Sequence, residues 1–319
     1  MTETLQNART QAERAGADVP FEDWMRQHQA RAQALIAHHV PQAHPVVPQL
    51  HEAMHYAAAQ GGKRVRPLLV WAAGECVRAD EAALDRAACA VELVHAYSLV
   101  HDDLPCMDDD VLRRGQPTTH VRFGEALALL AGDALQALAY EVLTPEAGVA
   151  PALQARLCAL LARASGAEGM AGGQTLDILS TGGAISGDDL MHMHSRKTGA
   201  LLKASVMMGA ACAGQVTERQ PAVELALEVY GEAIGLAFQV VDDILDVTAD
   251  SATLGKTAGK DAQQNKSTYV SALGLDAARQ LALTLRDKAQ SALDTLPAAQ
   301  CASSQRLREL ADLIVLRGH

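Results

Sequence analysis

The sequence predicts an all-α fold. Its 319 residues are 49% apolar and rich in Ala and Leu, whereas aromatic residues make up only 3%. Apolar residues recur three and four positions apart over long stretches, which is the spacing of one buried helix face. No run of alternating β-branched residues is long enough to predict a sheet. A chain of this size can bury a large core, so we expect a single domain over residues 31–319 behind a polar, frayed extension at residues 1–30.

Turn residues mark where the first helices should begin and end. The Pro-rich segment 41–48 separates two helices, and the charged turn at 61–67 opens another helix near Pro67. A long apolar helix is expected from about Leu84 into a run of acidic residues, where Pro105 should disrupt it.

The later helices follow the same logic. Ser186 or Asp188 could cap a helix that carries residues 196–199. The polar, glycine-containing segment 248–267 is predicted to be a mobile loop. Further helices are expected at 124–143, at 224–246 and, as two amphipathic helices, over the last part of the chain.

The overall charge limits the possible partners. The formal net charge is -11 and the sequence pI is about 5.5. A nucleic-acid-binding surface would be basic, so we expect no nucleic-acid partner. An anionic substrate would need local positive charge or metal ions to overcome the field of the protein.

The cysteines favour a reducing compartment, and the N-terminal composition does not favour export. The six cysteines show no Cys-x-x-Cys spacing and are expected to be buried thiols. Cys106 lies among acidic residues, which disfavour a thiolate, so no catalytic thiol is expected. No stretch has the roughly 18 uninterrupted apolar residues of a membrane span, and the N-terminal residues do not form a signal sequence. We therefore expect a cytoplasmic protein.

The first acidic cluster spans residues 101–110, directly after the long apolar helix. On an unbroken helix Asp102 and Asp108 would lie about 120° apart, but a distortion at Pro105 can bring Asp108 round toward Asp102. Acidic groups at a helix C-terminus oppose the helix macrodipole. A bound cation would offset that cost, whereas the alternative is a solvated helix end.

The second acidic cluster lies within an apolar helix. Asp242 and Asp246 are about 40° apart around the helix axis, as are Gln239 and Asp243, so the four polar groups share one face. A solvated acidic face is the alternative. Mg²⁺ prefers oxygen ligands and takes one or two carboxylates together with substrate phosphates. Two such clusters facing each other therefore predict a metal-bridged diphosphate site.

Basic residues that could hold phosphates lie near both clusters. Arg113 and Arg114 can bind phosphate oxygens in bidentate fashion, although pairing with neighbouring acids is the alternative. His95 lies two helical turns before Asp102 on the same face, where it could contact a phosphate. The other candidate cations are Lys63, Arg64 and Arg66 at a helix start and the scattered Lys197, Lys256 and Lys266.

Together these residues resemble the trans-isoprenyl diphosphate synthase family over nearly the whole chain after about residue 30. The family's first aspartate-rich motif matches residues 102–108, with the two-residue insertion of the bacterial type, and its second matches residues 242–246. Segments 61–67, 113–115, 197–199 and 238–239 stand in the family's order. Six motifs in order are a specific signal.

The resemblance implies an isoprenoid-synthase-like helical bundle around a large central cavity, usually in a homodimer. It implies three Mg²⁺ ions that bridge an allylic diphosphate to Asp102 and Asp108 on one side and to Asp242 on the other. The acids that would act as further ligands or orient bound water are Asp103, Asp243 and Asp246.

The resemblance also implies roles for the basic and polar residues. Lys266 would help to close the 248–267 loop and exclude water from a carbocation. The Thr198 hydroxyl, the Gln239 amide and the Lys197 carbonyl would offer oxygen dipoles to that cation. Isopentenyl diphosphate would be held by Lys63, Arg66, His95 and Arg114, and the allylic diphosphate by Arg113, Lys197 and Lys256.

The reaction implied is ionisation of the allylic diphosphate, attack by isopentenyl diphosphate and loss of a proton, with dimethylallyl and geranyl diphosphate as successive allylic substrates. Tyr97 lies about 7.5 Å along the helix from Asp102, where its ring would block long chains. The residue beside it, Ser98, is small and would also bear on chain length, and a fifteen-carbon product is expected.

Other functions remain open at this stage. Synthases of ten-carbon geranyl and twenty-carbon geranylgeranyl diphosphate share these motifs and differ mainly in the cavity floor. A terpene cyclase would need more aromatic rings to steer a cation. A non-catalytic helical subunit would be expected to lose one acidic cluster or the Arg113–Arg114 pair, and this sequence retains them.

Overall fold

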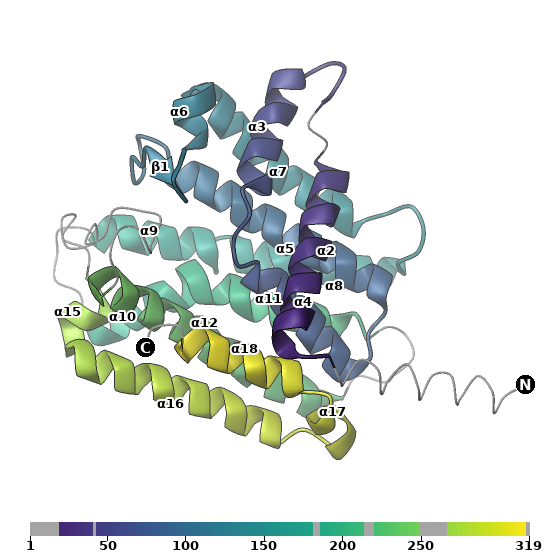
Figure 1. Cartoon of the computed structure of the whole chain (residues 1–319), viewed down its shortest axis with the longest axis vertical. Coiled ribbons are helices and arrows are strands. Elements are labelled where there is room, and N and C mark those ends of the chain that lie inside the picture. Colours follow the sequence, from purple (N-terminus) through teal and green to yellow (C-terminus); the bar gives the residue numbers. More distant parts are fainter. Residues whose placement is uncertain (1–18, 41–42, 181–185, 214–219, 249–266, 317–319) are drawn as a thin grey trace, which may run out of the picture.

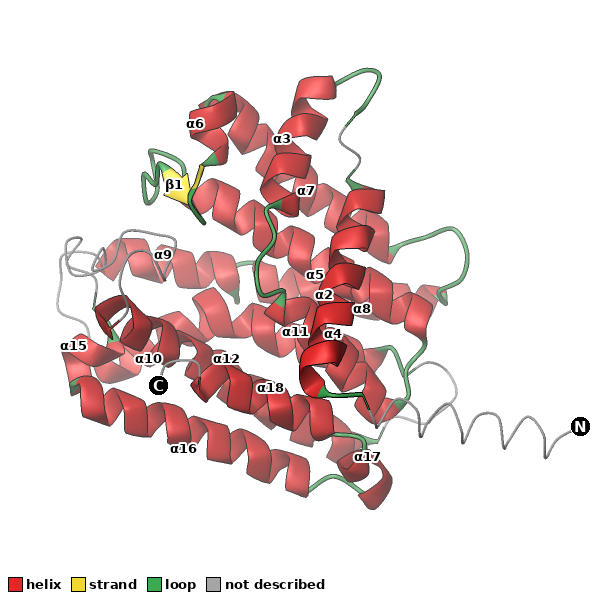
Figure 2. Cartoon of the chain, in the orientation of Figure 1, coloured by secondary structure: helices red, strands yellow, loops and turns green. Residues whose placement is uncertain are grey.

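The computed structural model describes residues 19–40, 43–180, 186–213, 220–248 and 267–316, and most of them are helical (Figures 1 and 2). The predicted all-α class is therefore confirmed. The described strands, β1 (Leu112–Arg113) and β2 (Gln116–Pro117), form one short antiparallel hairpin. The helices are α2 (Phe21–His39), α3 (Pro48–Ala59), α4 (Val65–Val77), α5 (Glu81–Asp102), α6 (Thr119–Phe123), α7 (Glu125–Leu143), α8 (Pro151–Ser165), α9 (Met170–Ser180), α10 (Gly187–His194), the π-helical η1 (Ser195–Gly199), α11 (Ala200–Ala211), α12 (Pro221–Thr248), α15 (Tyr269–Leu273), α16 (Leu275–Asp294), α17 (Ala298–Ala302) and α18 (Gln305–Leu316).

Helices α4, α5, α11 and α12 form the centre of the molecule (Figure 1). α4 and α5 bury residues on nearly all sides, as expected for helices that are apolar all round. α11 packs against the other three, and Gly209 allows this because a side chain there would meet the Val70 carbonyl of α4. One connected hydrophobic core reaches from Trp24 to Val315, which is the arrangement expected of a single domain.

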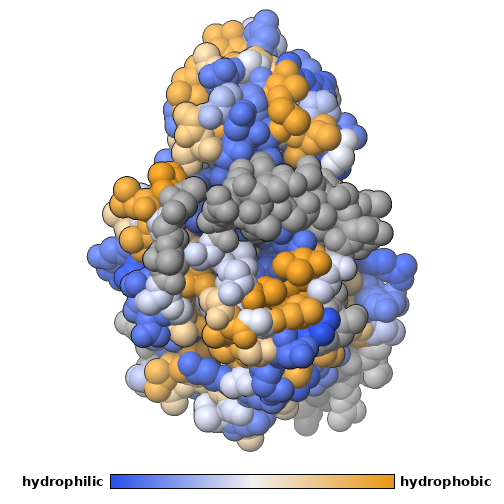
Figure 3. All heavy atoms as spheres, turned by 90° about the vertical axis from the view of Figure 1, so that its left-hand side faces the viewer, coloured by the Kyte–Doolittle hydropathy of each residue, from blue (hydrophilic) through white to orange (hydrophobic). Residues whose placement is uncertain are grey.

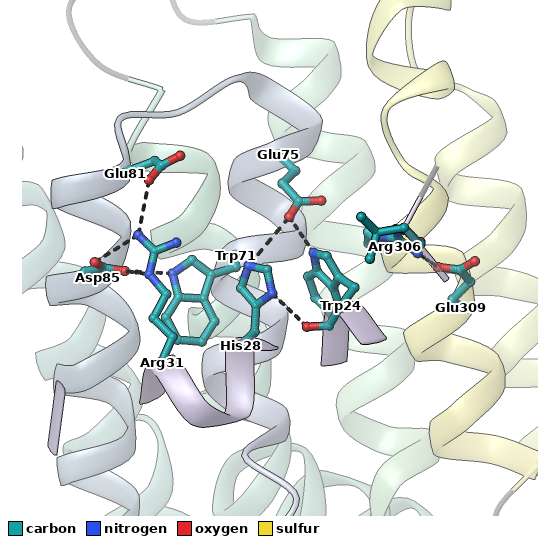
Figure 4. A network of polar contacts seen from close by, with 10 residues as sticks. Trp24, His28, Arg31, Trp71, Glu75, Glu81, Asp85, Arg306 and Glu309 are labelled. Carbon is teal, nitrogen blue, oxygen red and sulfur yellow. Dashed lines mark hydrogen bonds and ion pairs between the residues drawn. The ribbon is translucent and has the colours of Figure 1, made fainter. Parts of the chain in front are cut away.

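A polar network fastens α2 to the rest of the molecule (Figure 4). Trp24 Nε1 donates to Glu75 Oε1 at 2.7 Å, and Arg31 pairs with Asp85 at 2.7 Å. The guanidinium carbon of Arg306, in α18, lies 5.5 Å from the centre of the Trp24 ring. These contacts join α2 to α4, α5 and α18, and they bury Trp24 in the core.

The packed part of the chain therefore begins earlier than the sequence suggested. The boundary expected between residues 1–30 and 31–319 falls inside α2, which starts at Phe21. The partners of α2 lie far away in sequence, so its polar composition did not reveal them. Residues 1–18 lie outside the described residues.

The helix ends follow the expected chemistry with some differences. Asp80 caps α5 by accepting a hydrogen bond from the Ala83 N–H, and Ser186 caps α10 in the same way through the Asp189 N–H. The chain closes with α15, α16, α17 and α18 rather than with two helices. Most of the predicted 248–267 loop lies outside the described residues.

One described helix is apolar enough to deserve separate mention. By length and composition alone α7 is apolar enough to cross a membrane. Of its most apolar stretch of 18 residues, 39% is buried inside the structure. Core helices of compact proteins share this apolar character, and α7 packs against α3 and α5.

Candidate active site

A cavity of about 670 Å³ opens between α5, the loop that follows it, α9, η1 and α12. Figure 3 shows the end of the molecule formed by α9, α10 and α15, where hydrophobic and hydrophilic residues are interspersed around the grey segments. The cavity walls carry acidic residues from two distant parts of the chain, Asp102 and Asp108 on one side and Asp242 on the other. The two acidic clusters therefore meet at one cavity.

The first cluster reaches the cavity because α5 ends at Asp102. Beyond Pro105 the chain folds back, and the Asp108 N–H donates to the Asp102 carbonyl at 2.8 Å. Asp109 supports this turn with a positive φ of 50°. The expected break at Pro105 is thus confirmed, and it returns Asp108 to the level of Asp102 through a turn that ends the helix.

Asp103 does not line the large cavity, unlike its neighbour Asp102. Arg113 holds both of its oxygens, with Nη2 at 2.6 Å from Oδ1 and Nε at 2.9 Å from Oδ2. The Asp103 side chain is 3% exposed and is absent from the lining of the large cavity. Its placement does not support the expected ligand role, because its carboxylate is committed to orienting Arg113, which does line the cavity.

The second cluster divides between two surfaces rather than sharing one face. Asp242 lines the large cavity. Asp243 is buried, and it accepts hydrogen bonds from Gln239 Nε2 at 2.9 Å and from the Tyr269 N–H at 2.8 Å. Asp246 is also buried and lines neither the large cavity nor the small one beside it. The hydrogen bonds of Asp243 therefore support a structural role, and the placement of Asp246 outside both cavities does not support the expected ligand role.

The acids that line the cavity fit a hard divalent cation. Burial, reinforced by Asp108 and opposed by Lys197, raises the pKa of Asp102 to about 6, so its ionised form gains most from a nearby cation. Within the described residues no three His, Cys, Asp or Glu side chains converge on one point that could hold a metal. A cation here would need further ligands from outside the protein, which matches the preference of Mg²⁺ for a few carboxylates together with phosphate oxygens.

Basic residues line the same cavity as these acids. Arg66, His95, Arg113 and Arg114 all line the cavity. The Arg66 Nε is buried and has no hydrogen-bond partner among the described residues, and burial lowers the pKa of Arg66 to about 10. Burial, followed by the Arg66 charge, holds the pKa of His95 well below its usual value, so this imidazole is neutral. An anionic ligand would satisfy the donor of Arg66.

The turn before α4 helps to position these basic residues. Arg64 has a positive φ of 50° and is buried, where it donates to Glu92 at 2.6 Å and to the Ala58 carbonyl at 2.9 Å. Arg114 donates to the Gly61 carbonyl, and a side chain on Gly62 would lie 2.7 Å from its guanidinium.

Lys63, expected to hold isopentenyl diphosphate, has a different position from its neighbours in the turn. It is exposed and does not appear among the residues that line the cavity. Its expected contact with isopentenyl diphosphate therefore has no support from its placement.

A π-helical turn places Lys197 and Thr198 at the cavity. Gly199 in this turn packs on Gly235 of α12 so closely that a side chain on Gly235 would lie 2.8 Å from the Gly199 Cα. The Thr198 hydroxyl therefore reaches Gln239 and donates to its Oε1 at 3.0 Å. Since Gln239 Nε2 donates to Asp243, the orientation of this amide is fixed.

Two expected site residues, Lys256 and Lys266, lie outside the described residues. Their predicted contacts with the allylic diphosphate and with the closing loop stay predictions.

Comparison with known proteins identifies the family. The Polyprenyl synthetase family model matches residues 47–300. The chain belongs to the polyprenyl synthetase family. The resemblance inferred from the six motifs is therefore confirmed.

Related proteins match this polyprenyl synthetase over most of its length. The farnesyl diphosphate synthase of Escherichia coli is 51% identical over 270 residues, which cover 83% of this chain and 88% of that protein. The chloroplastic geranylgeranyl pyrophosphate synthase of Capsicum annuum is 47% identical over 271 residues, covering 84% and 71%. The crystal structure of a geranyltransferase from Helicobacter pylori, complexed with magnesium and isoprenyl diphosphate, has a TM-score of 0.82 at 32% identity, covering 93% and 98%. The predicted helical-bundle fold is confirmed by this similarity.

Both residues expected to set chain length lie at the cavity of this polyprenyl synthetase. Tyr97 and Ser98 line it. The Tyr97 ring lies 5.7 Å from the His101 ring at a steep angle, and the Ser98 hydroxyl donates to the His95 carbonyl at 2.9 Å. The Tyr97 ring therefore packs against His101 at the wall of the cavity.

One wall of the cavity comes from α9, none of whose residues was predicted to lie at the site. The available signal was the spacing of Gln174 and Asp177 after paired glycines, which puts two polar groups on one side of a short helix. The α9 residues that line the cavity are Met170, Ala171, Gln174, Thr175 and Ile178.

Proposed function

We propose that this polyprenyl synthetase is a Mg²⁺-dependent prenyltransferase that makes farnesyl diphosphate. It would join isopentenyl diphosphate to dimethylallyl diphosphate and then to geranyl diphosphate. The observation that carries the proposal is the single cavity with Asp102 and Asp108 on one wall, Asp242 on another and a cluster of arginines beside them. The names of its relatives in Escherichia coli and Helicobacter pylori support the same substrates.

The acids and the cations would divide the substrates between them. Asp102, Asp108 and Asp242 would hold the metal, with three ions expected from the resemblance to the family. When bound, Mg²⁺ would neutralise charge on the allylic diphosphate and so favour its departure. The residues that would hold the allylic diphosphate are Arg113, Lys197 and Lys256, and those that would hold isopentenyl diphosphate are Arg66, His95 and Arg114.

The chain's own polar groups would then guide the carbocation. The carbon–oxygen bond of the allylic diphosphate breaks, and the double bond of isopentenyl diphosphate forms the new carbon–carbon bond. Thr198 and Gln239 present oxygen atoms in a fixed orientation at the cavity, which stabilises positive charge without reorganisation. The released diphosphate accepts the proton lost from the intermediate, so no dedicated side-chain base is required.

A single assay tests this proposal. The protein is incubated with isopentenyl diphosphate, dimethylallyl diphosphate and Mg²⁺, and the dephosphorylated products are separated by chromatography. We expect a fifteen-carbon alcohol that disappears when a chelator removes the metal. The absence of any condensation product would favour a non-catalytic helical subunit instead.

Replacing Tyr97 with alanine should lengthen the product to twenty carbons or more. The ring lines the cavity beside α5, so its loss opens room for the growing chain. Chromatography of the products measures the change, and Tyr97→Phe, which keeps the ring, should leave the length unaltered. A fifteen-carbon product from Tyr97→Ala would show that the Tyr97 ring does not limit the length of the product. A twenty-carbon product from the unaltered protein would favour the geranylgeranyl alternative, which the Capsicum annuum relative represents.

We further propose a homodimer in the cytoplasm, built on the outer face of α7. Leu129 and Leu130 are 47% and 53% exposed on this apolar helix, and exposed apolar surface of this kind marks association sites. A second copy of the chain would cover both copies of this face at once through two-fold symmetry.

Replacing Leu130 with glutamate should convert the dimer into monomers, because a charge would be buried at the contact. Sedimentation velocity measures the change at a fixed protein concentration. Leu225→Glu is the matched control, since Leu225 is 62% exposed at the start of α12. A monomeric unaltered protein, or a dimer that survives Leu130→Glu, would contradict this assembly.

A further inference from the structure

Lys197 lies between two cavities. It lines the large cavity described above and also a chamber of about 70 Å³ behind it. The chamber is lined by Asp177, His194, Lys197, Gln239, Asp243, Ser267 and Thr268. The Lys197 side chain therefore forms part of the partition between the two spaces.

An ion pair holds Lys197 in this partition. Its ammonium group contacts Oδ2 of Asp177, in α9, and the two side chains are only 22% and 12% exposed. Lys197 also lines the large cavity together with Asp102. The Lys197 side chain therefore contacts Asp177 on one side and borders the large cavity on the other.

The packing of α9 against η1 makes this ion pair possible. Gly173 contacts the Lys197 backbone so closely that a side chain there would overlap the Lys197 nitrogen. Asp177 lies one helical turn after Gly173 and so faces the same neighbour. The position of α9 thus aims the Asp177 carboxylate at the Lys197 side chain.

His194 does not compete with Lys197 for this carboxylate. It is 6% exposed, and its Nδ1 has no hydrogen-bond partner among the described residues. Burial lowers the pKa of His194 to about 4, so the imidazole that faces the chamber is neutral. A chamber of this size has room for water beside His194, but the formal positive charge next to Asp177 comes from Lys197.

We infer that Asp177 is a positioning residue that acts through Lys197. An ammonium group has three donors. With one of them held by Asp177, the other two remain for ligands in the large cavity, which Lys197 also lines and where the allylic diphosphate binds under the function proposed above. Asp177 does not touch that substrate; it sets the place from which Lys197 does.

Asp177→Ala tests this inference through substrate selectivity. We expect the KM for geranyl diphosphate to rise about tenfold, the worth of one charge-assisted hydrogen bond, while the KM for isopentenyl diphosphate stays within twofold. Geranyl thiolodiphosphate is an analogue whose thiodiphosphate is a poor leaving group, so its binding can be measured without turnover. Its Kd, measured by calorimetry, should rise by the same factor. Asp177→Asn keeps an acceptor oxygen without the charge and should give an intermediate rise.

The double variant Lys197→Ala/Asp177→Ala separates positioning from a general structural effect. If Asp177 acts through Lys197, the double variant binds geranyl thiolodiphosphate as weakly as Lys197→Ala alone. Glu168→Ala, at an exposed site just before α9, is the control and should change neither constant.

The possible outcomes are distinct. An unchanged Kd in both Asp177 variants, an equal rise in both KM values, or a further loss in the double variant would each overturn the inference. If Asp177→Ala does not fold, as judged by its thermal transition, the Asn variant decides between the same outcomes. Failure of the unaltered protein to make any product would instead overturn the proposed function.

Discussion

Replacing Asp102 with asparagine should lower kcat for condensation by about 10²–10³-fold, the usual effect of removing one preorganised electrostatic group. Asparagine preserves the size and one acceptor oxygen but removes the charge that a divalent cation requires. The matched control is Asp109→Asn, because Asp109 is exposed in the same loop and its positive φ of 50° suits asparagine. Steady-state assays with saturating substrates and Mg²⁺ measure the difference.

The same variant should make the metal-free protein more stable at neutral pH. Because burial raises the pKa of Asp102 from 3.8 to about 6, this carboxyl favours folding below pH 4, and that contribution is lost as the pH rises through 6. Thermal unfolding in a chelator at pH 7.5 should therefore show a higher Tm for Asp102→Asn than for the unaltered protein, with the difference closing near pH 4. Lower stability together with lower activity would indicate a structural role for Asp102.

Replacing Glu92 with alanine should cost about 3–5 kcal/mol of unfolding free energy, the usual penalty for breaking a buried ion pair. The Arg64 and Glu92 side chains are 4% and 5% exposed and lie 2.6 Å apart. Without Glu92 the buried guanidinium keeps its charge and loses its counter-ion. The turn that carries Arg66 to the cavity should loosen with it, so the KM for isopentenyl diphosphate should also rise.

Urea unfolding measures this loss, and Glu81→Ala provides the comparison. Glu81 also pairs with an arginine, at 3.3 Å from Arg31, but its side chain is 84% exposed, so its loss should cost no more than about 1 kcal/mol. An equal cost for both substitutions would contradict the role assigned to burial. Conversely, replacing Arg64 and Glu92 together with apolar residues of similar volume should restore much of the stability.

The sequence was sufficient where local geometry decides the outcome. Helix periodicity places Asp242 on a polar face of α12, and the return of Asp108 to Asp102 follows from Pro105. The long apolar stretches predicted α5 and α12 because buried helices are apolar on most sides. These inferences need no knowledge of what packs against the helix.

The sequence was insufficient where a partner from another segment decides. Asp103 and Asp243 each follow a cavity acid directly in sequence, and helix geometry turns such a neighbour by about 100° without showing what it meets there. What separates them is that Arg113 and the Tyr269 N–H bind their carboxylates. Asp177 was missed for the same reason, because its meaning depends on Lys197 across the α9–η1 contact.

Two further differences come from backbone geometry. The π-helical turn at residues 195–199 changes the direction of Lys197 and Thr198 from that of a regular helix, and no composition rule predicts it. The extension expected over residues 1–30 overlaps α2 because Trp24 is held by Glu75 and Arg306, and contacts over such separations leave no local pattern.

The central claim is that acids from two distant helices hold one metal-bound diphosphate across a shared cavity. Calorimetric binding of geranyl thiolodiphosphate to the unaltered protein, Asp102→Asn and Asp242→Asn, each with Mg²⁺ and with a chelator, tests it most directly. We predict tight binding only for the unaltered protein with Mg²⁺, and at least tenfold weaker binding in either variant. Binding that persists in the chelator, or that survives the loss of one of the two acids, would contradict the account.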